Sequence, residues 1–174
     1  WNLATNPTAK FSDDEVYAAI YGNIVRSKDG GESWENVLGE PNMLENSSGD
    51  LNGSNASFFT NILITPNGKY FTYLSTFAPG QNVNTNFMNK GIFYSEDGDT
   101  WTNITPQGFV NFSERLVMAY APSNESILYF LVEGTTLQLW KYDNGNWTNR
   151  SNQIPNENSA FEAFDSQSSY NMTI

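Results

Sequence analysis

The stretch Ser27-Lys-Asp-Gly-Gly-Glu-Ser-Trp34 decides the fold, because two further versions of it follow along the chain. The second is Ser95-Glu-Asp-Gly-Asp-Thr-Trp101, one residue shorter. The third, Lys141-Tyr-Asp-Asn-Gly-Asn-Trp147, is more degenerate and has Lys141 where serine is expected. Each follows a short apolar run, and each tryptophan opens another strand. Self-similarity of this kind is the signature of a repeat architecture.

Further strand pairs lie between these turns. Asn-Gly at residues 67 and 68 separates two apolar runs, 61–66 and 70–76, and such a dipeptide is a strong hairpin signal. A similar pair, 116–122 and 127–132, flanks a turn near Asn124. Each repeat unit therefore has two hairpins in series, which is four strands. The sequence predicts an all-β fold, a β-propeller of four-stranded antiparallel blades.

The spacing of the repeats predicts about three blades and an incomplete ring. Trp34, Trp101 and Trp147 lie 67 and 46 residues apart, and propeller repeats run at roughly 40–50 residues. We expect the whole chain to be part of one propeller domain, either a portion of a larger polypeptide or completed by another chain. Its segments are a closing strand of a preceding blade (1–7), three blades (8–41, 58–106 and 112–155) and the start of a next blade (160–174).

The repeated turns resemble the Asp-box, or BNR-repeat, β-propellers, a superfamily that includes sialidases, xyloglucan-type glycosidases and sortilin-like receptors. The motif reads Ser, any, Asp, any, Gly, any, any, Trp. The resemblance implies that the aspartate and serine close the turn, that glycine supplies the backbone angles, and that the tryptophan ring packs between sheets. The residues that carry these structural roles are Ser27, Asp29, Gly31, Trp34, Ser95, Asp97, Gly98, Trp101, Asp143, Gly145 and Trp147.

Composition excludes several kinds of chemistry. The chain has no cysteine and no histidine, so disulfides, thiolate zinc sites and histidine-based triads are all excluded. Its formal net charge of −11 and its scattered lysines and arginines argue against nucleic-acid binding. No apolar run approaches the ~20 residues of a membrane helix. We expect no cofactor, no metal site and no membrane span.

No spacing of residues singles out a catalytic site. A sialidase needs an arginine triad, and the three arginines, Arg26, Arg115 and Arg150, lie in separate strands. A two-carboxylate glycosidase needs an acid and a base across a sugar. The carboxylates available for such a pair are Asp13, Asp14, Glu114 and Glu133. The hypothesis favoured is therefore a binding or display module without catalysis, and the alternative is a fragment of a propeller glycoside hydrolase.

Two long polar loops are the predicted contact regions. Residues 45–57 connect two blades and residues 78–90 lie inside the second blade. Long loops on a rigid scaffold commonly carry binding function, so the expected partner is protein or glycan, with further blades from the same or another chain. Asparagine occurs at 24 positions, nine of them in Asn-X-Ser/Thr sequons. The composition resembles that of bacterial surface-exported propellers and predicts a secreted or cell-surface protein; glycosylation of the sequons is the alternative it leaves open.

Overall fold

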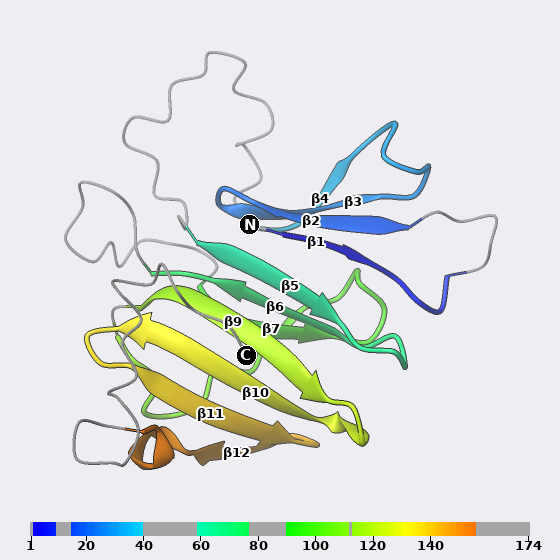
Figure 1. The fold of residues 1–174 in the computed structure, drawn as a ribbon. Coiled ribbons are helices and arrows are strands. Elements are labelled where there is room, and N and C mark those ends of the chain that lie inside the picture. Colours follow the sequence, from blue (N-terminus) through cyan, green and yellow to red (C-terminus); the bar gives the residue numbers. More distant parts are fainter. Residues whose placement is uncertain (1, 10–14, 40–58, 77–89, 112, 156–174) are drawn as a thin grey trace, which may run out of the picture. The chain divides into compact units, whose positions relative to one another are not determined.

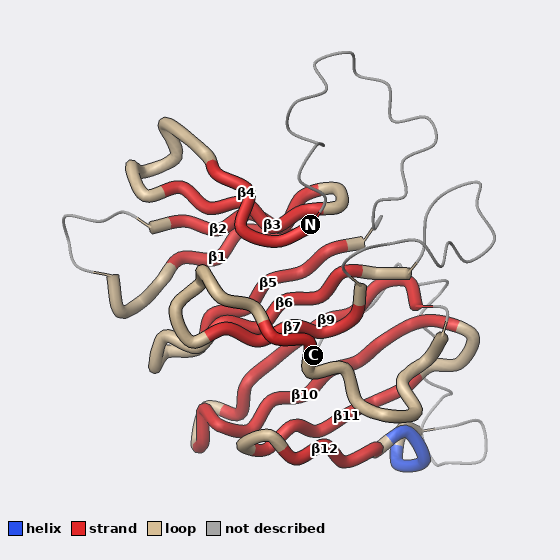
Figure 2. Tube along the Cα trace, turned by 180° about the vertical axis from the view of Figure 1, so that it is seen from behind, coloured by secondary structure: helices blue, strands red, loops and turns tan. Residues whose placement is uncertain are grey.

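Strands dominate the chain, and they form three separate antiparallel sheets of four strands each in the residues that the structure describes. The structure is a computed structural model that describes residues 2–9, 15–39, 59–76, 90–111 and 113–155. The chain divides into two compact units, Trp1–Thr105 and Pro106–Ile174. Figure 1 labels the strands along the chain, and in Figure 2 the one short helix of the described part follows β12.

The first unit contains two sheets, each with its strands side by side in chain order. The first sheet consists of β1 (Asn2–Thr5), β2 (Val16–Ile20), β3 (Asn23–Ser27) and β4 (Glu35–Gly39). The second consists of β5 (Thr60–Ile64), β6 (Tyr70–Leu74), β7 (Gly91–Ser95) and β8 (Thr102–Asn103). The predicted hairpin at Asn67 and Gly68 joins β5 to β6, with Gly68 at a φ of 77° that favours glycine.

A shared apolar core joins these two sheets. Tyr17, Ala19 and Ile24 come from the first sheet, and they pack in one buried cluster with residues of the second. The members from the second sheet are Ile62, Ile64, Tyr70, Leu74 and Phe93. Burying a side chain of this size is worth about 1.5–3 kcal/mol, so the cluster is the main force that holds the two sheets together.

Side-chain hydrogen bonds of Asn2 and Thr60 also join the two sheets. The amide of Asn2 on β1 behaves like a strand partner of β5, since it donates to the Ile62 carbonyl at 2.7 Å and accepts from the Ile62 N–H at 3.0 Å. The Thr60 hydroxyl donates to the carbonyl of Ile20 at 2.7 Å. Both contacts satisfy backbone groups at the open edge of β5 or at the end of β2, and buried backbone groups require such partners.

The second unit contains the third sheet and the short helix. Its strands are β9 (Ser113–Ala121), β10 (Asn124–Gly134), β11 (Gln138–Asp143) and β12 (Asn146–Asn149), followed by the 3-10 helix η1 (Ser151–Gln153). Trp147 lies at the centre of an aromatic group, with ring centroids 4.9 Å from Phe130 and from Tyr142 and 6.3 Å from Trp140. These rings share one face of the sheet because their residues are opposite one another in register.

The predicted fold class is confirmed: the chain is all-β, with three four-stranded antiparallel sheets whose strand order is that of propeller blades. One predicted segment boundary is wrong. Residues 1–7 were expected to close a preceding blade, but β1 pairs with β2 from Asn2↔Ala19 to Thr5↔Val16. The physical reason is that β2 without β1 would be an edge strand, with unpaired backbone N–H and C=O groups along one side. Pairing with β1 satisfies these groups. The segment 160–174 lies outside the described residues.

Candidate functional site

The first turn, residues 27–34 between β3 and β4, is closed by Ser27 and Asp29. The Ser27 hydroxyl donates to Asp29 Oδ1 at 2.6 Å and accepts from the Gly31 N–H at 2.8 Å. Asp29 Oδ1 also accepts the Ser33 N–H at 2.9 Å. Hydrogen bonds from the hydroxyls of Ser27 and Ser33 and from the Ser33 backbone hold the pKa of Asp29 far below its ordinary value. The carboxylate therefore acts as an acceptor that stabilises the turn.

The second turn, residues 95–101 between β7 and β8, repeats this pattern. Ser95 donates to Asp97 Oδ1 at 3.0 Å and accepts from the Gly98 N–H at 2.8 Å. Asp97 Oδ1 accepts the N–H groups of Thr100 at 2.8 Å and of Asp99 at 2.9 Å. These backbone bonds, together with Ser95, lower the pKa of Asp97. Both aspartates thus accept hydrogen bonds that close their own turns.

The third turn differs, as its sequence does. Asn144 and Gly145 both have positive φ, 47° and 87°, which is the geometry of a two-residue type I′ hairpin. Asp143 is held by an ion pair with Lys141 at 3.2 Å, where the other two turns have a serine hydroxyl. Position 143 therefore keeps the aspartate of the motif but not its turn-closing hydrogen bonds.

The three motif tryptophans have different surroundings. Trp101 is half-buried, packs against the core cluster of the first unit and lies 6.3 Å from the ring of Tyr70. Trp147 lies in the aromatic group of the third sheet. Trp34 does not fit the expectation of a ring packed between sheets, since it is 41% exposed. Its indole N–H donates to the Gly31 carbonyl within its own turn, and a contact so local leaves much of the ring uncovered.

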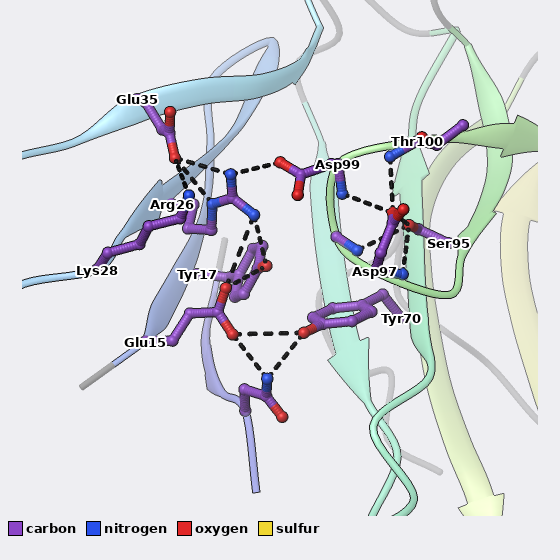
Figure 3. A network of polar contacts seen from close by, with 12 residues as sticks. Glu15, Tyr17, Arg26, Lys28, Glu35, Tyr70, Ser95, Asp97, Asp99 and Thr100 are labelled. Atoms are coloured by element: carbon purple, nitrogen blue, oxygen red, sulfur yellow. Dashed lines mark hydrogen bonds and ion pairs between the residues drawn. The ribbon is translucent and has the colours of Figure 1, made fainter. Parts of the chain in front are cut away.

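A network of charges around Arg26 joins the two sheets of the first unit (Figure 3). Arg26 lies on β3 and is only 3% exposed. Its guanidinium donates to Glu35 at 2.8 Å and to Asp99 of the second turn, and it lies 3.7 Å from Glu15. A buried guanidinium requires such partners, since an unpaired charge in the interior is strongly destabilising. Asp99 therefore links the second sheet to the first by an ion pair.

Tyrosines complete the network. The Tyr17 hydroxyl donates to Glu15 at 2.9 Å, and the Tyr70 hydroxyl accepts from the Asn6 amide, also at 2.9 Å. Tyr17 is completely buried, and burial raises its pKa well above the ordinary value; burial raises that of Tyr70 as well. A tyrosine beside a glutamate and an arginine has the composition of a nucleophilic site, but a buried neutral phenol serves here as a hydrogen-bonding link between sheets.

This network was not predicted from the sequence, in which Arg26 stands out only as a neighbour of the first turn. Two signals could have found it. In the sequence, Arg26 follows the apolar pair Ile24 and Val25, which is typical of a buried strand, and in the structure every residue of β3 is buried. A cation in an apolar strand needs carboxylate partners from neighbouring elements, and Glu15 and Glu35 lie at the starts of the adjoining segments.

The predicted carboxylate candidates fall into two groups. Asp13 and Asp14 lie outside the described residues. Glu114 and Glu133 are brought to one place, a register shift between β9 and β10 where Val132 pairs with Leu116 but Gly134 pairs with Ser113. One carboxylate oxygen of Glu133 is buried without a hydrogen-bond partner. β-Bulges often re-aim side chains near functional sites.

The other two arginines belong to the second unit. Arg115 lies on β9 opposite the same register shift, and Arg150 donates to Gln153 in the short helix at 3.4 Å. Within the described residues, no group of three or more acidic side chains is placed to hold a metal ion. The helix of the described part is too short to cross a membrane.

The strand ends that flank the two long loops lie at the same end of the two sheets of the first unit. Gly39 pairs with Asn23 at the β2–β3 turn, and Thr60 contacts Ile20 at that same turn. Thr60 also pairs with Leu74, which in turn pairs with Gly91. Gly39, Thr60, Leu74 and Gly91 therefore share one end of the two sheets, opposite the first and second turns. The loop 45–57, and all of the loop 78–90 except Lys90, lie outside the described residues.

No protein-family model matches the sequence, and no curated protein matches it. Among solved structures, the chain is similar to one described as YCF48 bound to D1 peptide, a β-propeller, with 16% sequence identity and a TM-score of 0.31. The alignment covers 84% of this chain and 53% of that one, so the chain spans about half the length of the structure it matches.

Proposed function

We propose that the chain is part of a non-catalytic β-propeller module, secreted or displayed at a cell surface, that binds protein or glycan through its long loops. The observation that carries this proposal is the shared position of the strand ends Gly39, Thr60, Leu74 and Gly91. Two loops that leave the same end of a rigid pair of sheets can form one continuous contact surface. The pairing of Arg26, Asp29 and Asp97 with structural partners supports a scaffold role for that pair of sheets.

The test is exchange of both loops for short Gly-Ser linkers, with binding measured on an array of neutral, acidic and sialylated glycans and on candidate surface proteins of the same source. We expect binding to be lost in the double exchange and weakened in each single exchange, while the far-ultraviolet circular dichroism is unchanged. Lys28→Ala, at the opposite end of the first sheet, is the matched control and should bind as the unaltered chain does. Binding that survives the double exchange would contradict the proposal.

A second candidate, a fragment of a propeller glycoside hydrolase, is favoured by Glu133. Its unpartnered carboxylate oxygen, at a register shift that also holds Glu114, is the arrangement from which an acid and base pair could be built. Hydrolysis of aryl sialosides or of xyloglucan by the full-length protein, abolished by Glu133→Gln and kept in Glu125→Gln, would favour this alternative over a binding module.

A further inference from the structure

The first and second turns have the same internal design, so their residues can be matched one to one. In each, the serine hydroxyl accepts the N–H of a glycine, Gly31 or Gly98. In each, the aspartate accepts the N–H of the residue before the tryptophan, Ser33 or Thr100. By this correspondence Glu32 of the first turn is equivalent to Asp99 of the second.

The outer residues of the second turn are docked on the preceding sheet. Gly98 lies so close to Tyr17 that a Cβ added to it would be 2.1 Å from the tyrosine hydroxyl. Asp99 forms its ion pair with Arg26, on the third strand of that sheet. Trp101 packs against the shared core. One turn thus supplies a close backbone approach, a carboxylate and an aromatic ring to its neighbour.

The same three positions of the first turn are open. A Cβ added to Gly31 would meet nothing nearer than the ring of Trp34, at 3.8 Å. Glu32 is exposed and has no ion pair with any residue that the structure describes. Trp34 is 41% exposed and is one of two large apolar side chains exposed in the described part of the chain. Among the described residues, the first turn therefore presents the second turn's docking groups without a partner.

We propose that the first turn is a docking surface for one further four-stranded blade, which carries a buried cation on its third strand. The cation would face Glu32 as Arg26 faces Asp99, and a hydroxyl-bearing aromatic side chain would cover Gly31 as Tyr17 covers Gly98. The proposal rests on the proposed function, in which the chain belongs to a larger propeller. Charge complementarity supports it, since an unpaired carboxylate beside an exposed indole fits a cation set in an apolar strand.

The third sheet of this chain does not have the required chemistry. When Asp143 is matched with Asp29, the position of Arg26 is taken by Trp140, a buried aromatic residue without charge. The partner blade is therefore one outside β9–β12, either elsewhere in the same polypeptide or in another chain.

The test is photo-cross-linking in the full-length protein expressed in its own host. A benzophenone amino acid replaces Glu32, and the control replaces Asn144 of the third turn, which is also exposed. We expect the probe at position 32 to cross-link to a single peptide that has arginine or lysine in an apolar strand followed by a serine- and aspartate-containing turn. No cross-link, a cross-link to position 32 of a second copy, a cross-link to residues 156–174, or the same products from position 144 would each overturn the proposal.

Hydroxyl-radical footprinting of Trp34 gives an independent readout without substitution. In the full-length protein its oxidation rate should be clearly lower than in the 174-residue chain, because the ring goes from 41% exposed to buried. Equal rates would overturn the proposal. This result and the loop-exchange experiment test different proposals. Binding through the loops with an exposed Trp34 would contradict only the docking proposal, whereas a buried Trp34 without loop-dependent binding would contradict only the proposed function.

Discussion

The first and second turns of this chain are built alike and situated differently. Both are closed by a serine and an aspartate, and in both a glycine N–H donates to the serine hydroxyl. The second lies against a neighbouring sheet through Gly98, Asp99 and Trp101, whereas the first exposes Gly31, Glu32 and Trp34. The comparison separates two roles within one short motif. The serine and aspartate shape each turn, whereas Gly98, Asp99 and Trp101 of the second turn join it to the neighbouring sheet.

The largest effect is expected at Arg26, which forms the ion pair with Asp99 of the second turn. Arg26→Met should lower the free energy of unfolding by about 3–5 kcal/mol, because it leaves Glu15 and its neighbours without their buried countercharge. Arg150→Met, at a more accessible arginine that donates to Gln153, is the control and should cost less than about 1 kcal/mol. Urea unfolding followed by tryptophan fluorescence measures both. Equal losses would show that the network around Arg26 does not join the sheets.

The next largest effect is expected at the equivalent glycines of the two turns, Gly98 and Gly31. Gly98→Ala forces a methyl group onto the Tyr17 hydroxyl and should cost about 2–4 kcal/mol, from overpacking together with the strain of alanine at a φ of 76°. Gly31→Ala, at a φ of 97°, carries the backbone strain alone and should cost about 1–2 kcal/mol. The difference between the two variants, again from urea unfolding, reports the contact with the first sheet. If Gly31→Ala costs as much as Gly98→Ala, the distinction between docked and open turns fails.

The carboxylates of the two turns should differ by a smaller amount. Asp99→Asn weakens an ion pair with a buried arginine and should cost about 1 kcal/mol, a figure limited by the exposure of Asp99 itself. Glu32→Gln in the 174-residue chain should change the free energy of unfolding by less than about 0.5 kcal/mol. Thermal unfolding of the two variants side by side gives the comparison. An equal loss at Glu32 would mean that it has a partner within the chain.

The smallest expected effect is a pH dependence that the two turns share. The folded-state pKa of Asp29, Asp97 and Glu35 is depressed, so each contributes stability above the ordinary carboxyl pKa, and this is lost as the pH falls below about 4. At the alkaline end, the raised pKa of Tyr17 and Tyr70 means that stability is lost as the pH rises above about 10. Urea midpoints from pH 2 to pH 7 should decline less in the double variant Asp29→Asn, Asp97→Asn. An unchanged acid slope would contradict the hydrogen-bonding role of the two aspartates.

Local chemistry made much of the fold predictable. The Asn-Gly turn at residue 67 and the repeated turns are specified by neighbouring residues, and each lies between strands as expected. The strand Asn2–Thr5 was assigned to the wrong blade, because pairing of β1 with β2 depends on an edge that sequence similarity does not reveal. Turn closure by Asp29 and Asp97 follows from their own neighbours, and so it too could be derived from the motif.

The contacts between sheets could not be predicted from the residues that neighbour each partner in the sequence. Arg26 and Asp99 are 73 residues apart, and nothing near either residue specifies the other. The same limit explains Trp34, since the motif places the ring at a definite point in the turn but does not say whether a neighbouring sheet is there to cover it. The exposure of that ring could be found only from the structure.

The most direct test of this account is a double-mutant cycle on Arg26 and Asp99. The central claim is that the second turn docks on the preceding sheet through this pair, so the free energies of unfolding of Arg26→Met, Asp99→Asn and the double variant should show a coupling of about 1 kcal/mol. A parallel cycle on Arg26 and Glu32 should show additive effects. Additivity within about 0.5 kcal/mol for Arg26 and Asp99 as well would contradict the account.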